Sequence, residues 1–430
     1  MNAVIFTRTS WNKIIRELAR DSSRIILFPA GLNQVQKNLE LIARGENRIL
    51  NNIHRLPENM VCLWSFQESD QSMLPENFFN NRLPETILKD YRGYIAGIGI
   101  GSESAIGYMA GYLRCPDGEV KPLSSIYING PELIEISFRQ ETPSIIQDSE
   151  LWSRTIGALG GEDTWSRITR IPFCIVGAGR SGSMMAKSLV KLGVKKLWLT
   201  DFDTIEKHNL DSMEMVVKKD LGRKKVDVLK DYLDLLPAHP SINVVPESIM
   251  SFKALRAVKE SRIITCTVDN DAARIGAVFL SAIYSKIFLD VGTGVFIDNS
   301  EQRQMGSSVR LILPGQGCLL CMGGISDMDR AREIILGKGD TREVNRDWRL
   351  ERSGSVASLN QIGVNLGIRL LEDLAAGRVS SSTFLQVEYN NNGIPSINSR
   401  TFDENNSRCP LCRLSGKGDE ALGMLQEVLF

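Results

Sequence analysis

The chain has 430 residues, and its 51 lysines and arginines balance its 51 aspartates and glutamates. The length allows two or three domains, and the hydrophobic fraction of 43% supports a sizeable core. The balanced charge argues against a general nucleic-acid binder. No uncharged apolar run reaches membrane-spanning length, and the N-terminus lacks a signal-peptide pattern, so we expect a cytoplasmic protein.

The first part of the chain, residues 1–148, contains no nucleotide motif and is expected to form an α+β domain. A helix is predicted from Ser10 to Asp21, with Ser10 as its N-cap. The Asp117-Gly118 pair indicates a hairpin turn. Six strands are predicted, at residues 24–28, 61–66, 94–100, 106–113, 124–128 and 133–138. Residues 140–149 are the expected linker to a second domain, 149–430.

The second part opens with a strand, a glycine-rich turn and a helix. The apolar run Phe173–Val176 predicts a buried parallel strand, and the helix that follows ends at Gly193. Between them, three glycines have the G-x-G-x-x-G spacing that allows a tight turn, a close phosphate and a closely packed helix: Gly177, Gly179 and Gly182. The next strand, Lys196–Thr200, ends at Asp201, an acceptor for ribose hydroxyls. The glycines alone are also typical of an NAD or FAD protein.

The residues after this second strand narrow the choice of nucleotide. Residues 201–211 read Asp-Phe-Asp-Thr-Ile-Glu-Lys-His-Asn-Leu-Asp, so that three acidic residues precede Asn209. This run resembles the D-x-D-x-(V/I)-E-x-x-N-L-(N/D)-R-Q pattern of the ThiF/MoeB/HesA family, which includes the E1 enzymes that activate ubiquitin and its relatives. The resemblance implies an α/β, Rossmann-like domain that binds ATP and adenylates the C-terminal carboxylate of a small protein.

Three further segments extend this resemblance. Leu151–Thr155 lies where the family has R-Y-x-R-Q, which puts Arg154 at the position that reaches the ATP phosphates of the other protomer in a homodimer. Lys225 matches the lysine of the family's G-x-x-K. The segment from Ile263 to Arg274 resembles C-T-D-N-x-x-x-R, in which the aspartate, here Asp269, holds Mg²⁺.

The implied chemistry explains these residue types. Adenylation is an in-line attack of a carboxylate on the α-phosphorus, so it requires alignment and charge neutralisation rather than a general base. We therefore assign charge stabilisation to Arg154 and Lys225, and Mg²⁺ binding to Asp269. The residues expected to bind the nucleotide are Gly177, Gly179, Gly182, Asp201, Asp203, Asn209 and Asn270.

One position departs from the family pattern. Ser212 stands where the family has an arginine that contacts the ATP phosphates. Arg180, inside the glycine turn, is one candidate to supply the missing charge. The other candidates are Lys218, Lys219, Arg223 and Lys224.

The eight cysteines provide a second signal. Four of them form two C-x-x-C pairs, Cys318 with Cys321 and Cys409 with Cys412. Two such pairs without a secretory signal predict a tetrahedral, structural Cys₄ zinc site, with a redox pair or disulfides as alternatives. Enzymes of the ThiF/MoeB type carry two pairs in this order. Their E1 relatives often hold a thioester cysteine in the loop before the last long helix, but residues 324–355 contain none.

The order of the two predicted domains indicates a possible biological pathway. It resembles bacterial E1-like proteins whose first domain is related to the JAB/MPN isopeptidase fold. Those peptidases use an H-x-H zinc motif, whereas residues 1–148 contain only His54, so such a domain would be inactive. The segments 288–294, 313–323 and 355–360 resemble ThiF-type proteins of ubiquitin-like conjugation operons, several of which act in antiviral defence. A ubiquitin-like substrate and an E2-like enzyme are the implied partners.

Three functions therefore compete. The first is an E1-like enzyme that activates a ubiquitin-like protein ending in glycine. The second is a ThiF-type enzyme that adenylates another carboxylate, such as that of a peptide or a sulfur carrier. The third is a non-enzymatic or redox Rossmann protein, which would bind NAD and release no pyrophosphate.

Overall fold

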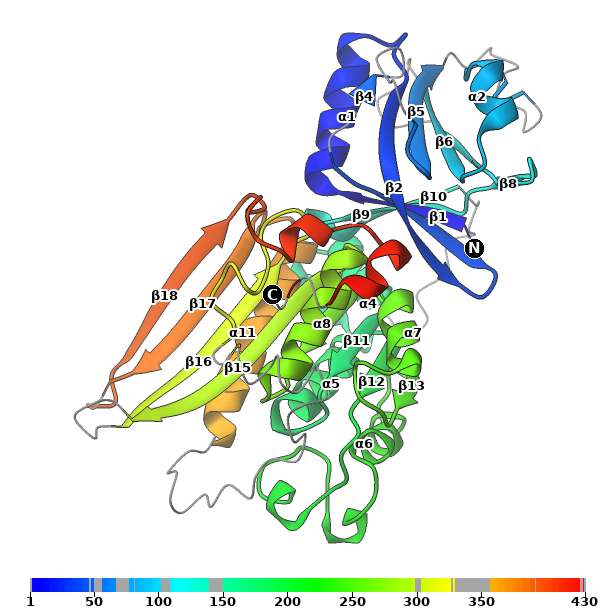
Figure 1. Ribbon diagram of the computed structural model, residues 1–430. Helices are drawn as coiled ribbons and strands as arrows, with labels where there is room; N and C mark the ends of the chain where they lie inside the picture. Colours follow the sequence, from blue (N-terminus) through cyan, green and yellow to red (C-terminus); the bar gives the residue numbers. More distant parts are fainter. Residues whose placement is uncertain are drawn as a thin grey trace. The chain divides into compact units, whose positions relative to one another are not determined.

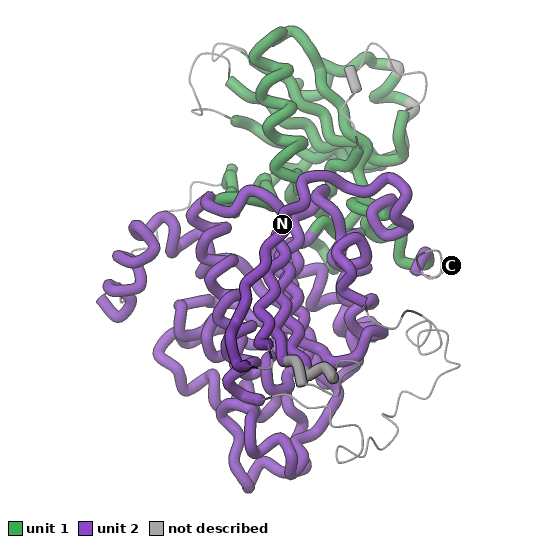
Figure 2. The backbone as a smooth tube through the Cα atoms, turned by 90° about the vertical axis from the view of Figure 1, so that its left-hand side faces the viewer, with its two compact units in different colours: residues 1–147, 283–285, 414–423 green, residues 148–282, 286–413, 424–430 purple. Residues whose placement is uncertain are grey.

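The computed structural model describes residues 2–45, 48–49, 56–66, 77–80, 82–101, 109–138, 150–297, 303–325, 328, 356–390, 392–425 and 428. The chain divides into two compact units (Figure 2). Unit 1 comprises residues 1–147, 283–285 and 414–423, and unit 2 comprises residues 148–282, 286–413 and 424–430. The sequence contains no signal that two short segments from its second half belong with the first. The predicted linker and His54 lie outside the described residues.

Unit 1 is built on one mixed sheet, with the strand order β10-β9-β1-β3-β2-β5-β6-β7-β8 and with β4 paired to β2 (Figure 1). Alternate residues of β5 point to opposite faces, so Val61 packs in the cluster that includes α1, and Trp64 packs in a second cluster with Phe78. The elements are β1 (Asn2–Thr7), α1 (Arg8–Arg20), β2 (Ile26–Val35), β3 (Asn38–Ala43), β4 (Arg48–Ile49), β5 (Met60–Phe66), α2 (Glu85–Asp90), β6 (Ile95–Gly101), β7 (Met109–Arg114), β8 (Val120–Pro122), β9 (Ser125–Asn129), η3 (Pro131–Leu133) and β10 (Ile134–Ser137).

The first helix corrects one prediction. Helix α1 begins at Arg8, and its N-cap is Thr7 rather than Ser10. The Thr7 hydroxyl accepts the backbone N–H of Ser10 at 3.1 Å, so Ser10 lies inside the first turn as the donor. Strands β1 and β3, which pair in parallel near the middle of the sheet, were not predicted. The six predicted strands all occur, with ends shifted by at most three residues except where β2 extends seven residues further, to Val35.

Unit 2 is built on an eight-stranded sheet with the order β13-β12-β11-β14-β15-β16-β17-β18. The first five strands of this order are parallel, and β16, β17 and β18 continue the sheet in antiparallel fashion. The strands are β11 (Phe173–Val176), β12 (Lys196–Thr200), β13 (Ser241–Val245), β14 (Ile263–Cys266), β15 (Ile287–Ile297), β16 (Arg303–Ile312), β17 (Ser382–Tyr389) and β18 (Pro395–Phe402).

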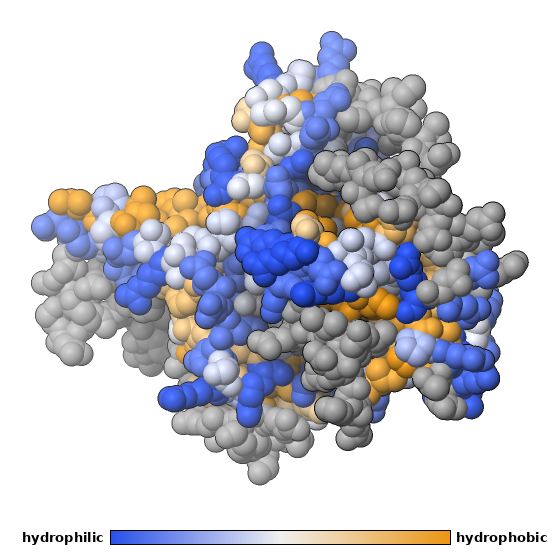
Figure 3. Space-filling view, turned by 90° about the horizontal axis from the view of Figure 1, so that it is seen from above, coloured by the Kyte–Doolittle hydropathy of each residue, from blue (hydrophilic) through white to orange (hydrophobic). Residues whose placement is uncertain are grey.

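Helices connect and cover the parallel strands. Helix α11 packs against β15 and β16 beside α5, and α7 packs against β12 and β13. The helices are α3 (Ser153–Leu159), α4 (Glu162–Thr169), α5 (Arg180–Leu192), η4 (Lys207–Asn209), η5 (Lys218–Asp220), α6 (Lys225–Leu233), α7 (Phe252–Glu260), α8 (Asp271–Ile283), α11 (Ala357–Ala375) and η6 (Cys412–Leu414). The last helical segment, η7 (Asp419–Met424), belongs mostly to unit 1. Among the described residues, no helix combines the length and the apolar character needed to cross a membrane. Hydrophilic and hydrophobic residues intermingle on the face drawn in Figure 3.

Candidate active site

The glycine turn joins the central strand β11 to helix α5, as the sequence predicts. Gly177 has a φ of +93°, which side chains rarely adopt, and a Cβ at Gly182 would lie 1.9 Å from the Gly177 carbonyl oxygen. Both positions therefore require glycine. A Cβ at Gly179 would have no heavy atom within 4 Å, so the backbone there is open to a ligand. The N-terminal end of α5, a suitable place for a phosphate, begins at the next residue.

Asp201 lies directly beside this turn. Its Oδ2 accepts the backbone N–H of Ala178 at 2.7 Å, and its Oδ1 accepts that of Asp203 at 2.8 Å. Burial raises the pKa of the Asp201 carboxyl, and Lys225 opposes this effect. Because each carboxylate oxygen has two lone pairs, each keeps acceptor capacity for a ribose hydroxyl. The carboxylate thus ties the end of β12 to the glycine turn.

Lys225 stands at the first position of α6, with three carboxylates around it. Its Nζ lies 2.7 Å from Asp203 Oδ2, and its side chain is only 12% exposed. Burial by itself would lower the pKa of Lys225, but the carboxylates of Asp201, Asp203 and Asp269 outweigh it and raise this pKa. The structure therefore brings together the predicted lysine and three predicted aspartates.

Asp269 and Asn270 follow strand β14, which lies next to β11. Both are exposed, in a short turn before α8. Asn270 Oδ1 accepts the backbone N–H of Ala273 at 2.7 Å, so its side chain caps the helix. The hydroxyl of Thr267, in the same connection, donates to the Gly177 carbonyl at 2.8 Å. An exposed carboxylate at the carboxyl ends of parallel strands suits Mg²⁺, which prefers oxygen ligands.

The loop after Asp203 is also held against the glycine turn. The buried Asn209 accepts the backbone N–H of Glu206 through Oδ1 at 2.9 Å, so it shapes this loop from inside. Arg180 Nη2 lies 3.3 Å from Asp211 Oδ1. The Ser212 hydroxyl donates to the same Asp211 oxygen at 2.6 Å. Arg180 thus lies beside the position where an arginine was expected in place of Ser212.

The structure does not bring Arg154 to this site within one chain. Arg154 is exposed on the first turn of α3, and the neighbouring Trp152 donates through Nε1 to the Lys191 carbonyl at 2.9 Å. Lys191 lies at the far end of α5, and a helix of 13 residues spans about 20 Å. Arg154 and the glycine turn therefore lie at opposite ends of α5.

The four paired cysteines converge as predicted. The Sγ of Cys318 lies 3.6 Å from that of Cys321 and 3.5 Å from that of Cys409, and Cys321 lies 3.6 Å from Cys412. All four sulfurs lie within 4.8 Å of one another. Four sulfurs at 2.3 Å from a tetrahedral Zn²⁺ would be separated by about 3.8 Å, so the cluster fits zinc with every position filled by protein.

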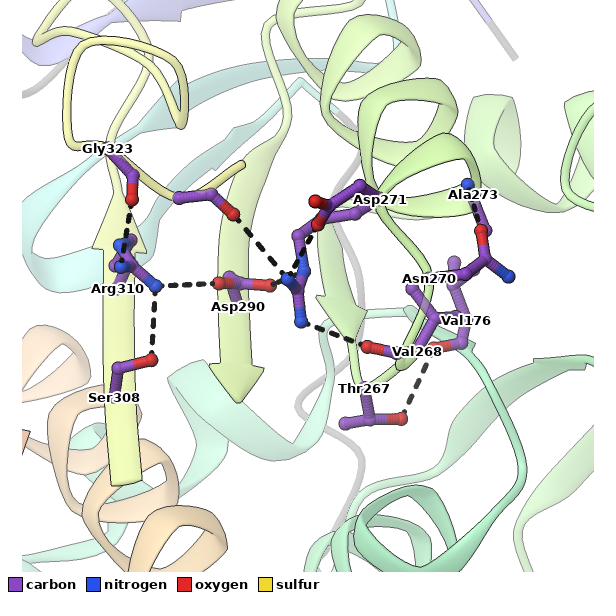
Figure 4. A network of polar contacts seen from close by, with 12 residues as sticks. Val176, Thr267, Val268, Asn270, Asp271, Ala273, Asp290, Ser308, Arg310 and Gly323 are labelled. Carbon is purple, nitrogen blue, oxygen red and sulfur yellow. Dashed lines mark hydrogen bonds and ion pairs between the residues drawn. The ribbon is translucent and has the colours of Figure 1, made fainter. Parts of the chain in front are cut away.

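A buried ion cluster that was not predicted from the sequence joins α8, β15 and β16. Asp290 on β15 is fully buried and lies 3.1 Å from both Arg274 and Arg310 (Figure 4). Asp290 and Arg310 face each other across the β15–β16 pair. The sequence signal is a charged residue inside each strand: Asp290 is the only charge in β15, and Arg310 lies in β16, which also contains Arg303. Such residues are almost never buried unless paired, so they could have been matched as partners.

Comparisons with known proteins identify the family of the chain. The model of the ThiF family matches residues 152–372, just over half of the chain. The chain belongs to the ThiF family. This is the family of E1-like adenylyltransferases predicted from the sequence. The predicted fold class is also confirmed: an α/β, Rossmann-like ThiF domain with a four-cysteine cluster, preceded by a sheet domain.

Individual relatives match over short stretches. SUMO-activating enzyme subunit 2 of Dictyostelium discoideum is 35% identical over 83 residues, which is 19% of this chain and 12% of that protein. Adenylyltransferase and sulfurtransferase uba4 of Aspergillus clavatus is 35% identical over 100 residues, 23% of this chain and 20% of that protein. The chain thus spans a fifth or less of these relatives. A crystal structure of E. coli MccB with ATP is 17% identical, with a TM-score of 0.46 over 62% of this chain and 75% of that one.

Proposed function

We propose that the chain uses Mg-ATP to adenylate the C-terminal carboxylate of a small ubiquitin-like protein ending in glycine, with release of pyrophosphate. One observation carries the proposal. The open backbone at Gly179 lies among the carboxyl ends of β11, β12 and β14, where Asp201, Lys225 and Asp269 converge. This is where open α/β sheets bind ligands. Membership of the ThiF family favours ATP over a dinucleotide.

Each residue has a distinct part in this proposal. The N–H groups at the start of α5 receive the phosphates, and Asp201 accepts hydrogen bonds from the ribose. Asp269 holds Mg²⁺, which neutralises phosphate charge when bound. Lys225 stabilises the negative charge that builds up as the substrate carboxylate attacks the α-phosphorus in line and pyrophosphate leaves. Arg180 supplies the positive charge that Ser212 lacks.

Pyrophosphate exchange tests the reaction. We expect the purified chain to exchange labelled pyrophosphate into ATP only when a small protein ending in glycine is added. Exchange with a short peptide but not with that protein would favour the alternative, ThiF-type adenylation of a peptide or sulfur carrier. NAD binding without exchange would overturn adenylation altogether.

Arg154 tests whether the site is shared between two protomers. We propose a homodimer in which Arg154 reaches the ATP phosphates of the partner, because Arg154 and the glycine turn of the same chain lie at opposite ends of α5. Arg154→Ala should abolish exchange, as should Asp269→Ala. Mixing the two variants should restore part of the activity, because a mixed dimer contains one intact site. If mixing restores none, the shared site is wrong.

The biological setting rests on the sequence resemblance alone. We propose that the acyl group passes from the adenylate to a cysteine thiol of an E2-like enzyme, with release of AMP, in a bacterial conjugation pathway for antiviral defence. Loss of phage protection in cells that carry Lys225→Met, with protection by the unaltered chain, would support this. Equal phage resistance in both strains would exclude it while leaving the exchange reaction standing.

A further inference from the structure

The buried ion cluster contains contacts that the proposed reaction does not itself explain. Asp290 is completely enclosed and lies between two guanidinium groups, that of Arg274 on α8 and that of Arg310 on β16. Arg310 also stacks on Phe384, with 4.3 Å from its guanidinium carbon to the ring centroid. Burying three charges costs free energy unless every partner is in place, so the geometry of this cluster is tightly constrained.

On one side, the cluster holds the turn that carries Asp269. Arg274 Nη2 donates to the Val268 carbonyl at 3.0 Å, and its Nη1 donates to Asp271 at 3.2 Å (Figure 4). Val268 directly precedes Asp269 in the chain, and Asp271 follows it by two residues. The position of Arg274 therefore determines where the exposed Asp269 carboxylate lies.

On the other side, the cluster reaches the first cysteine pair. Arg310 Nη2 donates to the Gly323 carbonyl at 3.4 Å, and Arg274 Nη1 donates to the Gly324 carbonyl at 3.5 Å. Gly323 and Gly324 close the turn that begins at Cys318, because their N–H groups donate back to the carbonyls of Leu320 and Leu319. The turn that supplies two of the four sulfurs thus also supplies two acceptors to the cluster.

We propose that the four-cysteine metal site is coupled to the magnesium turn through Arg310, Asp290 and Arg274, which act as positioning residues. A metal ion fixes the 318–324 turn and keeps its two carbonyls against the guanidinium groups. When the metal leaves, these acceptors move, Arg274 shifts, and the turn carrying Asp269 loosens. The inference rests on the proposed function for the role of Asp269. Coupling between two sites is reciprocal, so Mg-ATP must in turn tighten the binding of zinc.

Zinc affinity is therefore the measurement. The full chain is loaded with zinc and titrated with a chromogenic chelator, with and without Mg-ATP, in the absence of any substrate protein. We expect Mg-ATP to raise the zinc affinity by about five-fold or more. In Arg310→Gln, which keeps the ion pair between Asp290 and Arg274, this increase should fall below about two-fold. Arg369→Gln, a change to an exposed arginine on α11, is the matched control and should behave as the unaltered chain.

The outcomes separate this inference from the proposed function. Equilibrium dialysis first shows whether the chain binds ATP, and failure there sinks the proposed function itself. If ATP binds but Mg-ATP leaves the zinc affinity unchanged, the coupling is wrong. If Mg-ATP raises the zinc affinity of Arg310→Gln as much as that of the unaltered chain, the coupling does not run through Arg310. The comparison with and without Mg-ATP uses the unaltered chain, so it stands even if Arg310→Gln does not fold.

Discussion

Two groups of charges lie within unit 2, and they differ in balance and exposure. Around Lys225, one positive charge faces three carboxylates, and Asp203 and Asp269 are exposed. Around Asp290, two arginines pair with Asp290 and Asp271, and the side chain of each of these four residues is at most 14% exposed. The group around Lys225, here called the open group, has surplus negative charge and is suited to binding a cation and a charged ligand. The group around Asp290, here called the closed group, is buried and balanced in charge and is suited to a structural role. The balance of charge and the exposure of the side chains thus distinguish residues expected to bind ligands from residues expected to stabilise the fold.

The largest expected effect is on stability, and it tests the closed group. Asp290→Asn leaves Arg310 without its counter-charge and Arg274 with Asp271 alone, which should lower the free energy of unfolding by about 3–5 kcal/mol. Asp203→Asn makes the same chemical change in the open group, where the side chain is 48% exposed, and should cost less than about 1 kcal/mol. Denaturant unfolding of both variants provides the measurement. Equal losses would remove the distinction between the two groups.

The next effect is on activity, and it tests the open group. Lys225→Met should reduce pyrophosphate exchange about 10²- to 10³-fold, the usual cost of removing one group that stabilises developing charge. Lys230→Met on the same helix is the control, because Lys230 forms an exposed pair with Asp234. Initial exchange rates at saturating ATP provide the comparison. Similar rates in Lys225→Met and Lys230→Met would exclude Lys225 from the chemistry.

The open group was predictable partly from local rules and partly from the resemblance to the ThiF family, which pointed to Lys225 and Asp269. The strand, turn and helix from Phe173 to Leu192 follow from short-range rules, and Asp201 lies at the end of the next strand. The closed group was not predictable in this way. Arg274, Asp290 and Arg310 come from three elements, and only the β15–β16 register places two of them opposite each other.

The same reason explains the errors in unit 1. Strands β1 and β3 are separated in the chain by α1 and β2, yet they pair with each other in parallel. Strand β1 also pairs in parallel with β9, and β3 pairs antiparallel with β2. The cap of α1 was misplaced because Thr7 and Ser10 are both good capping residues. The strand that precedes the helix decides between them, since β1 ends at Thr7 in extended backbone.

A smaller effect tests how closely the glycine turn is packed. In Gly182→Ala the new methyl would lie 1.9 Å from the Gly177 carbonyl, so the turn must shift, at a cost of about 1–3 kcal/mol in stability. ATP affinity, measured by equilibrium dialysis, should fall as well. Gly157→Ala on α3 meets no atom within 4 Å and should be neutral or slightly stabilising. If Gly182→Ala keeps both properties, the helix does not pack against the turn as closely as described.

The smallest effect is a pH dependence that belongs to the open group. The carboxylates around Lys225 raise its pKa above the ordinary 10.5, so the folded chain holds this proton more tightly than the unfolded chain. The resulting stability is fully present below pH 10.5 and is lost as the pH rises through the folded value. The difference in unfolding free energy between the unaltered chain and Lys225→Met should therefore be constant from pH 7 to about 10 and shrink above it. A difference that already shrinks near pH 8 would mean that the three carboxylates do not act on Lys225 together, and the open group would lose its defining feature.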